Sequence, residues 1–382
     1  MFEFGQIINK RYIFVKSINS GAFSSVWLMF DISKNNICIA KVINEEDKET
    51  GENEIKILNK IKRLSKNTEI FNNLLLFTEN IIINNQIIII EDYQNLTLKD
   101  LIYDFNLSPT DKKTVITNIK NQLIPVICFL KNNKLLHADI KPENIFLSIP
   151  DYQNLDINDN IKNFLSELST FKPKKQKYKF IQSVITKYKK ILLDKFIDDV
   201  KNDLSDSSDF IDSAQTDSDI HSDYDESEKI NDFLVDKILE YKNNDSTDYK
   251  TDKKIIDFDI KNITYLIGDF GNTIDYSKTD NYKEIINLRF HDLQTRYYRH
   301  PNIIMRSENI LDSDFYAFDI IIKEIENLNL PFDPAKSHGE TTDHNHLRCL
   351  INNDYKIQCE KGRKTKLFFN HDKITNIYYL GK

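Results

Sequence analysis

The feature that most constrains this chain is the segment His137–Asn144, which reads HADIKPEN. Asp139 can accept or orient the proton of a hydroxyl group, Lys141 can neutralise a moving phosphoryl group, and Asn144 can hold Mg²⁺. His137 is expected to be a structural core residue and not a catalyst. The segment therefore predicts that Asp139 and Lys141 are catalytic and that Asn144 is a metal ligand.

A glycine-containing stretch, Ile18–Trp27, lies earlier in the chain between two strand-like runs. A flexible loop of small residues can fold its backbone N–H groups over phosphates. Only the middle glycine of a G-x-G-x-x-G pattern is present, as Gly21, because Asn19 and Ser24 hold the flanking positions. Alone, the stretch favours a simple hairpin turn. The nucleotide contacts it predicts are Ile18, Gly21 and Val26.

A lysine in a strand-like run, Lys41, precedes a helix-like segment that contains Glu54. A buried strand lysine needs a partner, and Glu54 is the candidate. Paired in this way, Lys41 can hold the α- and β-phosphates of ATP. Without the other motifs, a surface lysine and a solvated glutamate would be the preferred interpretation.

The tripeptide Asp269-Phe270-Gly271 follows the apolar run Tyr265–Ile267. Asp269 is a second candidate ligand for Mg²⁺, since hard oxygen ligands suit that ion. The tripeptide is common and says little alone. After a strand and the segment His137–Asn144, it indicates the same phosphate chemistry.

In this order, the pieces resemble the signature set of protein kinases. They are most similar to the SR-protein kinase family of the CMGC group, on the segments Phe23–Leu28, His137–Asn144, Asp269–Asn272, Gln294–Arg299 and Phe332–Glu340. The resemblance implies an α+β, bilobal protein-kinase-like fold with a small β-rich N-lobe and an α-rich C-lobe. It also implies transfer of the γ-phosphate of ATP, with Mg²⁺, to Ser or Thr. Further, it implies that Leu293–Pro301 forms a substrate floor and that Asp314 holds the catalytic-loop backbone.

Apolar patterning predicts strands from about Tyr12 to Ile43, at Leu74–Phe77 and at Ile87–Ile90. It predicts a helix from about Gly51 to Leu64, with an apolar face formed by Ile55, Leu58, Ile61 and Leu64. The expected domains are an N-lobe over 8–95, a first C-lobe part with the catalytic loop over 96–150, a spacer over 151–262, and a second, shortened C-lobe part over 263–382.

The net negative charge of the chain is concentrated in the spacer. Between Asn202 and Glu228 there are ten acidic residues and no Lys or Arg, against a net charge of −7 for the whole chain. This part is expected to be disordered, because it buries too little apolar surface to offset chain entropy.

Protein substrates with Arg-Ser tracts are implied by the resemblance. Two kinds of departure bear on this expectation. Ile39 stands where the family has a small residue that packs against the adenine of ATP. In addition, approximate alignment puts neutral Asn329, Asn345 and Asn352 where the family has carboxylates that bind the substrate. The alternative function is a pseudokinase, a nucleotide- or partner-binding scaffold that turns over poorly.

Other features exclude several classes of protein. There is no signal-like N-terminus, no apolar run long enough to span a bilayer and no C-x-x-C pair. We expect an intracellular monomer, cytoplasmic or nuclear, with no membrane or direct nucleic-acid partner. The frequent Asn, Ile and Lys indicate an AT-rich genome, and for a viral genome the setting would be the host cell or the virion.

Overall fold

The computed structural model describes residues 2, 6–21, 23–34, 36–150, 253–277, 293–307, 310–333, 343, 345–347 and 349, together with the backbone of 357–359 and 377–379. These residues belong to one compact unit of the chain. Spacer residues 151–252, which include the acidic stretch, the segment 334–340 and Asn352 lie outside the described residues.

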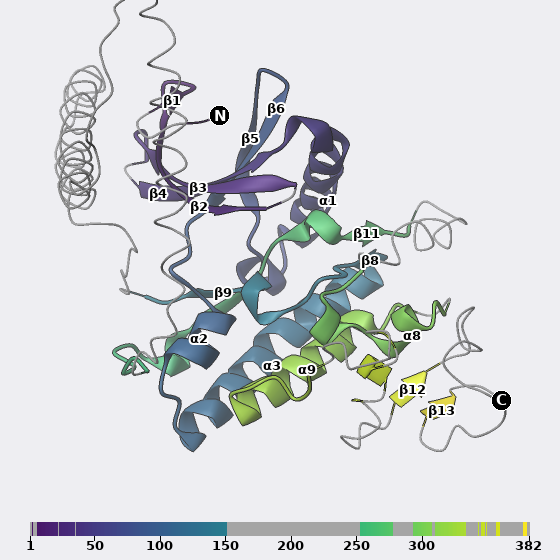
Figure 1. Ribbon diagram of the computed structural model, residues 1–382. Helices are drawn as coiled ribbons and strands as arrows, with labels where there is room; N and C mark the ends of the chain where they lie inside the picture. Colours follow the sequence, from purple (N-terminus) through teal and green to yellow (C-terminus); the bar gives the residue numbers. More distant parts are fainter. Residues whose placement is uncertain are drawn as a thin grey trace, which may run out of the picture. The chain divides into compact units, whose positions relative to one another are not determined.

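The first part of the chain forms a six-stranded antiparallel sheet with the order β1-β2-β3-β4-β6-β5 (Figure 1). Its strands are β1 (Ile7–Ile8), β2 (Tyr12–Ser20), β3 (Ser24–Asp31), β4 (Asn36–Ile43), β5 (Phe77–Ile83) and β6 (Gln86–Asp92). A short 3-10 turn, η1 (Glu45–Asp47), leads into helix α1 (Lys48–Ser65). The glycine stretch is therefore the β2–β3 hairpin, and Lys41 lies in β4.

Helix α1 confirms the predicted helix and corrects part of its face. Leu58 and Ile61 are fully buried, as expected, and Ile57 is buried as well. Ile55 and Leu64 are only partly buried, because the face is centred on the row through Glu54, Leu58 and Ile61. Glu54 thus shares the inward face of the helix with apolar residues.

The strand predicted at Leu74–Phe77 begins later than expected. After 3-10 helix η2 (Glu69–Asn73), Leu74 and Leu75 bridge to Ile267, with Leu75 N donating to Ile267 O at 2.9 Å. Strand β5 starts only at Phe77. It turns into β6 through Asn84 and Asn85, whose φ values of 49° and 65° suit a tight hairpin.

The second part of the described chain is mainly helical. Its α-helices are α2 (Leu98–Asp104), α3 (Pro109–Asn132), α8 (Pro301–Ile304) and α9 (Ser313–Asn327). Its 3-10 helices are η3 (Pro142–Asn144), η4 (Ile260–Asn262), η5 (Phe270–Asn272) and η6 (Arg296–Tyr298). Ser108 and Asp111 form a capping box at the start of α3, with Pro109 in the first turn.

Short strand pairs hold the loops between these helices. One sheet has the order β10-β9-β7 and another pairs β11 with β8. The strands are β7 (Leu96–Thr97), β8 (Leu135–Leu136), β9 (Ile145–Ser148), β10 (Thr264–Ile267) and β11 (Ile274–Asp275). Near the C-terminus β12 (Ile357–Cys359) pairs in parallel with β13 (Ile377–Tyr379). As a result, β8 and β9 flank the segment 137–144, and β10 leads directly to Asp269.

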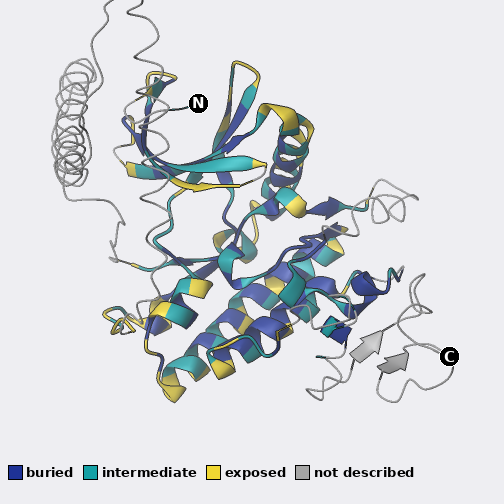
Figure 2. Cartoon of the chain, in the orientation of Figure 1, coloured by how far each residue is buried: buried dark blue, intermediate teal, exposed yellow. Residues whose placement is uncertain are grey.

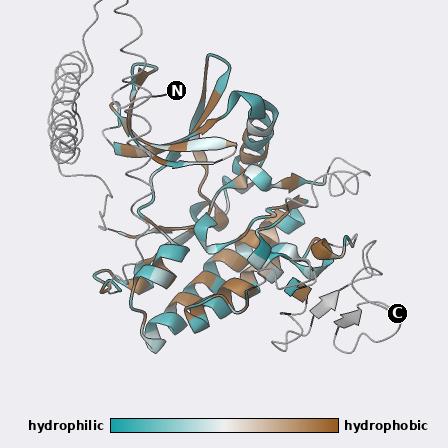
Figure 3. Cartoon of the chain, viewed as in Figure 1, coloured by the Kyte–Doolittle hydropathy of each residue, from teal (hydrophilic) through white to brown (hydrophobic). Residues whose placement is uncertain are grey.

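The cores follow this division. A cluster on one face of the large sheet contains Phe14, Met29 and Ile88. A larger cluster joins the inner face of α1 to α2, α3 and α9, which Figure 2 shows as dark stripes and Figure 3 as hydrophobic ones. The small β-rich lobe and the larger α-rich lobe are as expected from the sequence. No helix among the described residues is long and apolar enough to cross a membrane.

Residues after the spacer pack on the helical lobe from position 253 onward. Lys254 N donates to Asp104 O at 2.7 Å, and Asn106 N donates to Lys254 O at 3.0 Å. Phe258 packs edge-on against Phe105, with ring centroids 5.5 Å apart. The end of the range expected to be spacer is therefore attached at the C-terminal end of α2.

Candidate active site

Three charged side chains from distant parts of the sequence meet at one end of a pocket. Lys41 Nζ lies 2.8 Å from Glu54 Oε1 and 2.8 Å from Asp269 Oδ1. β4 supplies the lysine, α1 the glutamate, and the turn before η5 the aspartate. A Cβ at Gly271 would lie 3.2 Å from both Glu54 Oε2 and Lys41 Nζ, so this close approach suits glycine.

The three groups shift one another's pKa values. Burial by itself lowers the pKa of Lys41, but Asp269 and Glu54 raise it above its ordinary value. Burial also raises the pKa of Asp269, but the Lys41 ammonium outweighs this effect and holds that pKa below its ordinary value. The Glu54 side chain is only 2% exposed, and burial keeps its pKa raised even beside Lys41.

The segment 137–144 forms a loop in which Asp139 is bound on several sides. Asp139 Oδ2 accepts a hydrogen bond from Lys141 Nζ at 2.9 Å, and its backbone oxygen accepts one from Asn144 Nδ2 at 2.8 Å. Thr295 donates to Asp139 Oδ1 through both its backbone N, at 3.0 Å, and its Oγ1, at 2.8 Å. Lys141 Nζ also contacts Thr295 Oγ1 at 3.1 Å. The carboxylate is thus fixed in orientation, with an ammonium group beside it.

Helix α9 anchors this loop through the side chain of Asp314. Asp314 accepts hydrogen bonds from the backbone N of His137 at 2.7 Å and of Ala138 at 3.0 Å. Burial raises the pKa of Asp314, and these two donors oppose the rise. The prediction that Asp314 holds the loop backbone is therefore confirmed.

His137 joins the loop to the β10 end. It is fully buried, its Nε2 lies 3.0 Å from Gly268 O, and its ring packs edge-on against Phe270. It makes these contacts inside the core, two residues before Asp139. This placement agrees with the structural role expected for it.

The pocket beside these groups has a volume of about 680 Å³, which is within the usual range for ligand sites. Its lining includes the predicted residues Ile18, Gly21, Val26, Lys41, Glu54, Asn144 and Asp269. Asp139 and Lys141 are not part of that lining and are connected to it through Asn144. Thus the structure places the predicted nucleotide and metal residues around one cavity, with the predicted catalytic pair next to it.

The pocket has two chemically different ends. We call the region of Lys41, Glu54, Asn144 and Asp269 the charged end. The base end is the part of the lining formed by the apolar side chains Val26, Leu28, Ile39, Leu75 and Phe146, with the linker Asp92–Asn95 at its edge. An apolar region next to a charged cluster suits a nucleotide, whose base is apolar on its faces and whose phosphates are charged.

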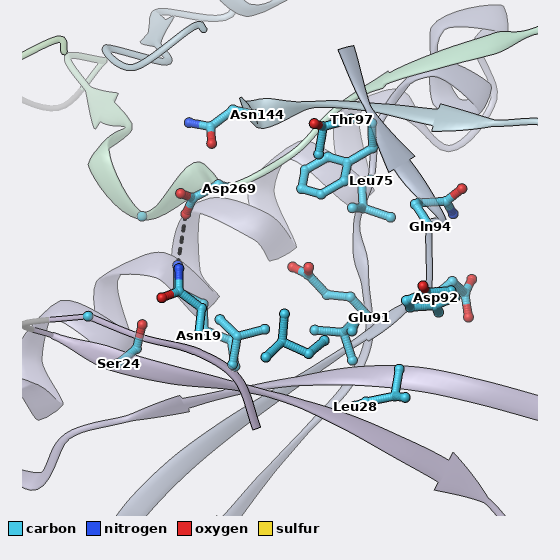
Figure 4. Close-up of a pocket in the computed structure, with 18 of the residues that line it drawn as sticks. Asn19, Ser24, Leu28, Leu75, Glu91, Asp92, Gln94, Thr97, Asn144 and Asp269 are labelled. Carbon is cyan, nitrogen blue, oxygen red and sulfur yellow. Dashed lines mark hydrogen bonds and ion pairs between the residues drawn. The ribbon is translucent and has the colours of Figure 1, made fainter. Parts of the chain in front are cut away.

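The charged end has suitable ligands for a divalent cation. Asn144 uses its Nδ2 to bind Asp139 O, which leaves its Oδ1 as an acceptor. In Figure 4, Asn144 and Asp269 lie at the same end of the pocket, and Asn19 of β2 points toward them. One amide oxygen and one carboxylate, completed by phosphate oxygens, match the sparse protein ligation that Mg²⁺ favours.

Two residues of the site were not singled out from the sequence. Thr295 binds both Asp139 and Lys141, and the only sequence signal for it is its place in the predicted substrate floor. Glu91 lines the base end, and no local pattern identified it. Both depend on contacts across long sequence separations.

Comparison with known proteins bears on the same residues. A family profile described as "Protein kinase domain" matches residues 12–164. Serine/threonine-protein kinase prpf4B of Dictyostelium discoideum is 28% identical over 149 residues, which are 38% of this chain and 18% of that protein. Dual specificity protein kinase CLK2 of Homo sapiens is 28% identical over 156 residues, 40% of this chain and 31% of the relative.

A longer match extends beyond the profile. Protein L205 of Acanthamoeba polyphaga mimivirus, also named as a serine/threonine-protein kinase, is 23% identical over 403 aligned positions, which cover 90% of this chain and 72% of L205. By contrast, the chain matches less than a third of the length of prpf4B and CLK2. The two lobes, the pocket between them and the matched profile show that this chain has the fold of a protein kinase domain.

Proposed function

We propose that this protein is an ATP-dependent protein Ser/Thr kinase. The observation that carries the proposal is the position of Asp139, held by Thr295 and Lys141 directly beside a pocket whose charged end contains Lys41 and Asp269. A hydroxyl acceptor and a phosphoryl donor can meet at this point.

In the proposed reaction, a Ser or Thr oxygen attacks the γ-phosphorus of ATP. The bond from that phosphorus to the β,γ-bridging oxygen breaks, ADP leaves, and Asp139 receives the hydroxyl proton. In this proposal Lys141 neutralises charge on the transferred group, and Lys41 binds the other phosphates. Asn144 and Asp269 would hold Mg²⁺, which supplies charge neutralisation at the phosphate oxygens when bound.

The test is transfer of labelled γ-phosphate from ATP with Mg²⁺ to Ser/Thr peptides by the full chain and by Asp139→Asn. We expect the substitution to lower the rate by about 10²–10⁴-fold, because the proton acceptor is lost. Nucleotide binding should persist, since Asp139 is not part of the pocket lining. Equal incorporation by both proteins would mean that the activity comes from a contaminating kinase and would leave the proposed function without support.

As a finer proposal, the acceptor belongs to Arg-Ser-rich proteins, as the resemblance to SR-protein kinases implies. The peptide panel should therefore include Arg-Ser, acidic and neutral sequences. Asn329 and Asn345 carry no charge to attract arginine, so transfer restricted to acidic or neutral peptides would discard this proposal and retain the kinase. Nucleotide binding without transfer to any peptide would instead leave a scaffold of the pseudokinase type.

A further inference from the structure

An ion pair outside the pocket joins helix α1 to strand β11. Lys60 Nζ, in the C-terminal half of α1, lies 2.8 Å from Asp275 Oδ1 and donates a hydrogen bond to Ser277 Oγ at 3.0 Å. The side chains of Lys60 and Asp275 are each only 18% exposed, and neither lines the pocket. In Figure 1, η5 and β11 lie just below α1, and α1 packs against η5. The pair therefore connects two elements that also supply Glu54 and Asp269 to the charged end.

Asp275 is held firmly in its charged form. Its Oδ1 accepts hydrogen bonds from Ser277 N at 3.0 Å and from Ser277 Oγ at 2.6 Å, in addition to the contact with Lys60. Burial raises the pKa of Asp275, but these donors outweigh burial and hold that pKa below its ordinary value. Because the two side chains are mostly enclosed, salt screens their attraction less than that of an exposed pair.

The segment that carries Asp275 is fixed on the helical lobe. Strand β11 pairs in antiparallel with β8, which leads directly into the loop of Asp139. The next residue, Tyr276, donates from its backbone N to Lys134 O at 3.0 Å. Lys60 thus reaches from the small lobe to a segment attached beside the catalytic loop.

The same segment is also bound to the small lobe at its other end. Asp269 binds Lys41, and Lys41 binds Glu54 of α1. Helix α1 therefore has two electrostatic links to the segment 269–275, one through Lys41 and one directly through Lys60. A single link would leave the helix free to turn about it, whereas two separated links fix its orientation.

We propose that Lys60 is a positioning residue for phosphoryl transfer, which holds α1 through Asp275 so that Glu54 stays bound to Lys41. This inference goes beyond the proposed function and rests on it only for the transfer measurement. Without the Lys60 link, α1 can turn about the remaining one, and the Lys41 ammonium loses its fixed direction. Small misplacements of groups near the reacting atoms lower the rate strongly.

The first test compares Lys60→Met with Lys56→Met, which makes the same change at an exposed position one turn earlier on α1. Transfer of labelled γ-phosphate from ATP with Mg²⁺ gives kcat and KM per folded protein. We expect Lys60→Met and Asp275→Asn to lower kcat by roughly tenfold to a hundredfold, with a smaller change in the KM for ATP. Lys60→Arg keeps the positive charge and should retain most of the rate. Equal kcat values for Lys60→Met and Lys56→Met would overturn the proposal.

A second test asks whether Lys60 acts through Glu54. In a Glu54→Gln background, Lys60→Met should slow transfer little further, because the group that Lys60 positions is already lost. Fully additive losses would mean that Lys60 acts by another route and would reject the proposed role. Urea unfolding of each variant gives the folded fraction, so a residue that only stabilises the fold would leave kcat per folded protein unchanged.

Hydrogen–deuterium exchange tests the same link without any transfer. On the full chain without nucleotide, the amides of α1 should exchange faster in Lys60→Met than in Lys56→Met, because a helix with one link opens more readily. Identical exchange in the two variants would contradict the proposal. If wild type transfers no phosphate, the proposed function fails, and the exchange result alone decides whether Lys60 holds α1.

Discussion

The two ends of the pocket satisfy their polar groups in opposite ways. At the charged end, Lys41 binds both Glu54 and Asp269, so each of these charged side chains has a partner within the folded chain. At the base end, the Glu91 side chain makes no hydrogen bond to a described residue and faces the cavity. The comparison shows that folding itself pairs the charged groups at one end, whereas at the other end a carboxyl side chain faces the cavity without a hydrogen bond to any described residue.

The strongest test of the charged end is Lys41→Met. Removing the ammonium leaves Glu54 enclosed without its counter-charge, so we expect the free energy of unfolding to fall by about 3–5 kcal/mol. Urea denaturation without nucleotide measures this change. The double variant Lys41→Met/Glu54→Gln is the control and should recover much of the loss, because it removes the second buried charge. A single variant as stable as wild type would show that the ion pair does not stabilise the fold.

The base end can be tested through pH. Glu91 binds its proton up to about pH 8 in the folded protein, but an unfolded glutamate releases it near its ordinary pKa of 4.5. Between these values the unfolded state holds fewer protons, so stability falls as pH rises, by at most about 1.4 kcal/mol per pH unit. Glu91→Gln lacks this titration. Its stability relative to wild type should therefore increase from pH 5 to pH 8.

Urea unfolding of both proteins at several pH values, without nucleotide or Mg²⁺, measures that difference. Glu46→Gln provides the reference, because its carboxylate is exposed outside the pocket. A stability difference between Glu91→Gln and wild type that stays constant with pH would mean that the Glu91 carboxyl is already ionised in the folded protein. Both ends of the pocket would then contain ionised carboxylates, and they would differ only in whether a lysine binds them.

The smallest expected effect concerns Gly268. This residue immediately precedes Asp269 of the charged end and lies against Phe146 and Leu75 of the base end. A Cβ at this position would lie 2.8 Å from Phe146 Cε2 and 3.1 Å from Leu75 Cβ. Gly268→Ala should therefore displace base-end side chains and cost about 1–3 kcal/mol through overpacking. Thermal unfolding gives the stability, and ADP titration should show weaker binding. Unchanged values for both would mean that the base end adapts without loss.

Sequence reasoning could reach the charged end because its chemistry lies in short motifs. Asp139, Lys141 and Asn144 share one loop, and Asp269 follows a recognisable strand. The spacing in each motif restricts which side chains can face the phosphates. The pairing of Lys41 with Glu54 required only one strand followed by one helix, and the structure has both.

The position of Glu91 at the base end could not be predicted in the same way, since a glutamate after a run of isoleucines is typical of a strand end at the surface. Only the pairing of Ile39 with Glu91 shows which face the carboxyl occupies. Likewise, the bridge of Leu74 to Ile267 displaced the start of β5, and Thr295 reaches Asp139 across 156 positions. These are tertiary contacts, and local periodicity does not encode them.

The ammonium group of Lys41 has three N–H bonds, of which two point to Glu54 and Asp269. Because Lys41 also lines the pocket, the third N–H can donate a hydrogen bond to an incoming anion. An oxygen of that anion can therefore accept this bond without displacing either carboxylate. Arrival of a ligand would then be an addition to a preassembled tetrahedral centre, with no exchange of partners and no reorganisation of the lysine.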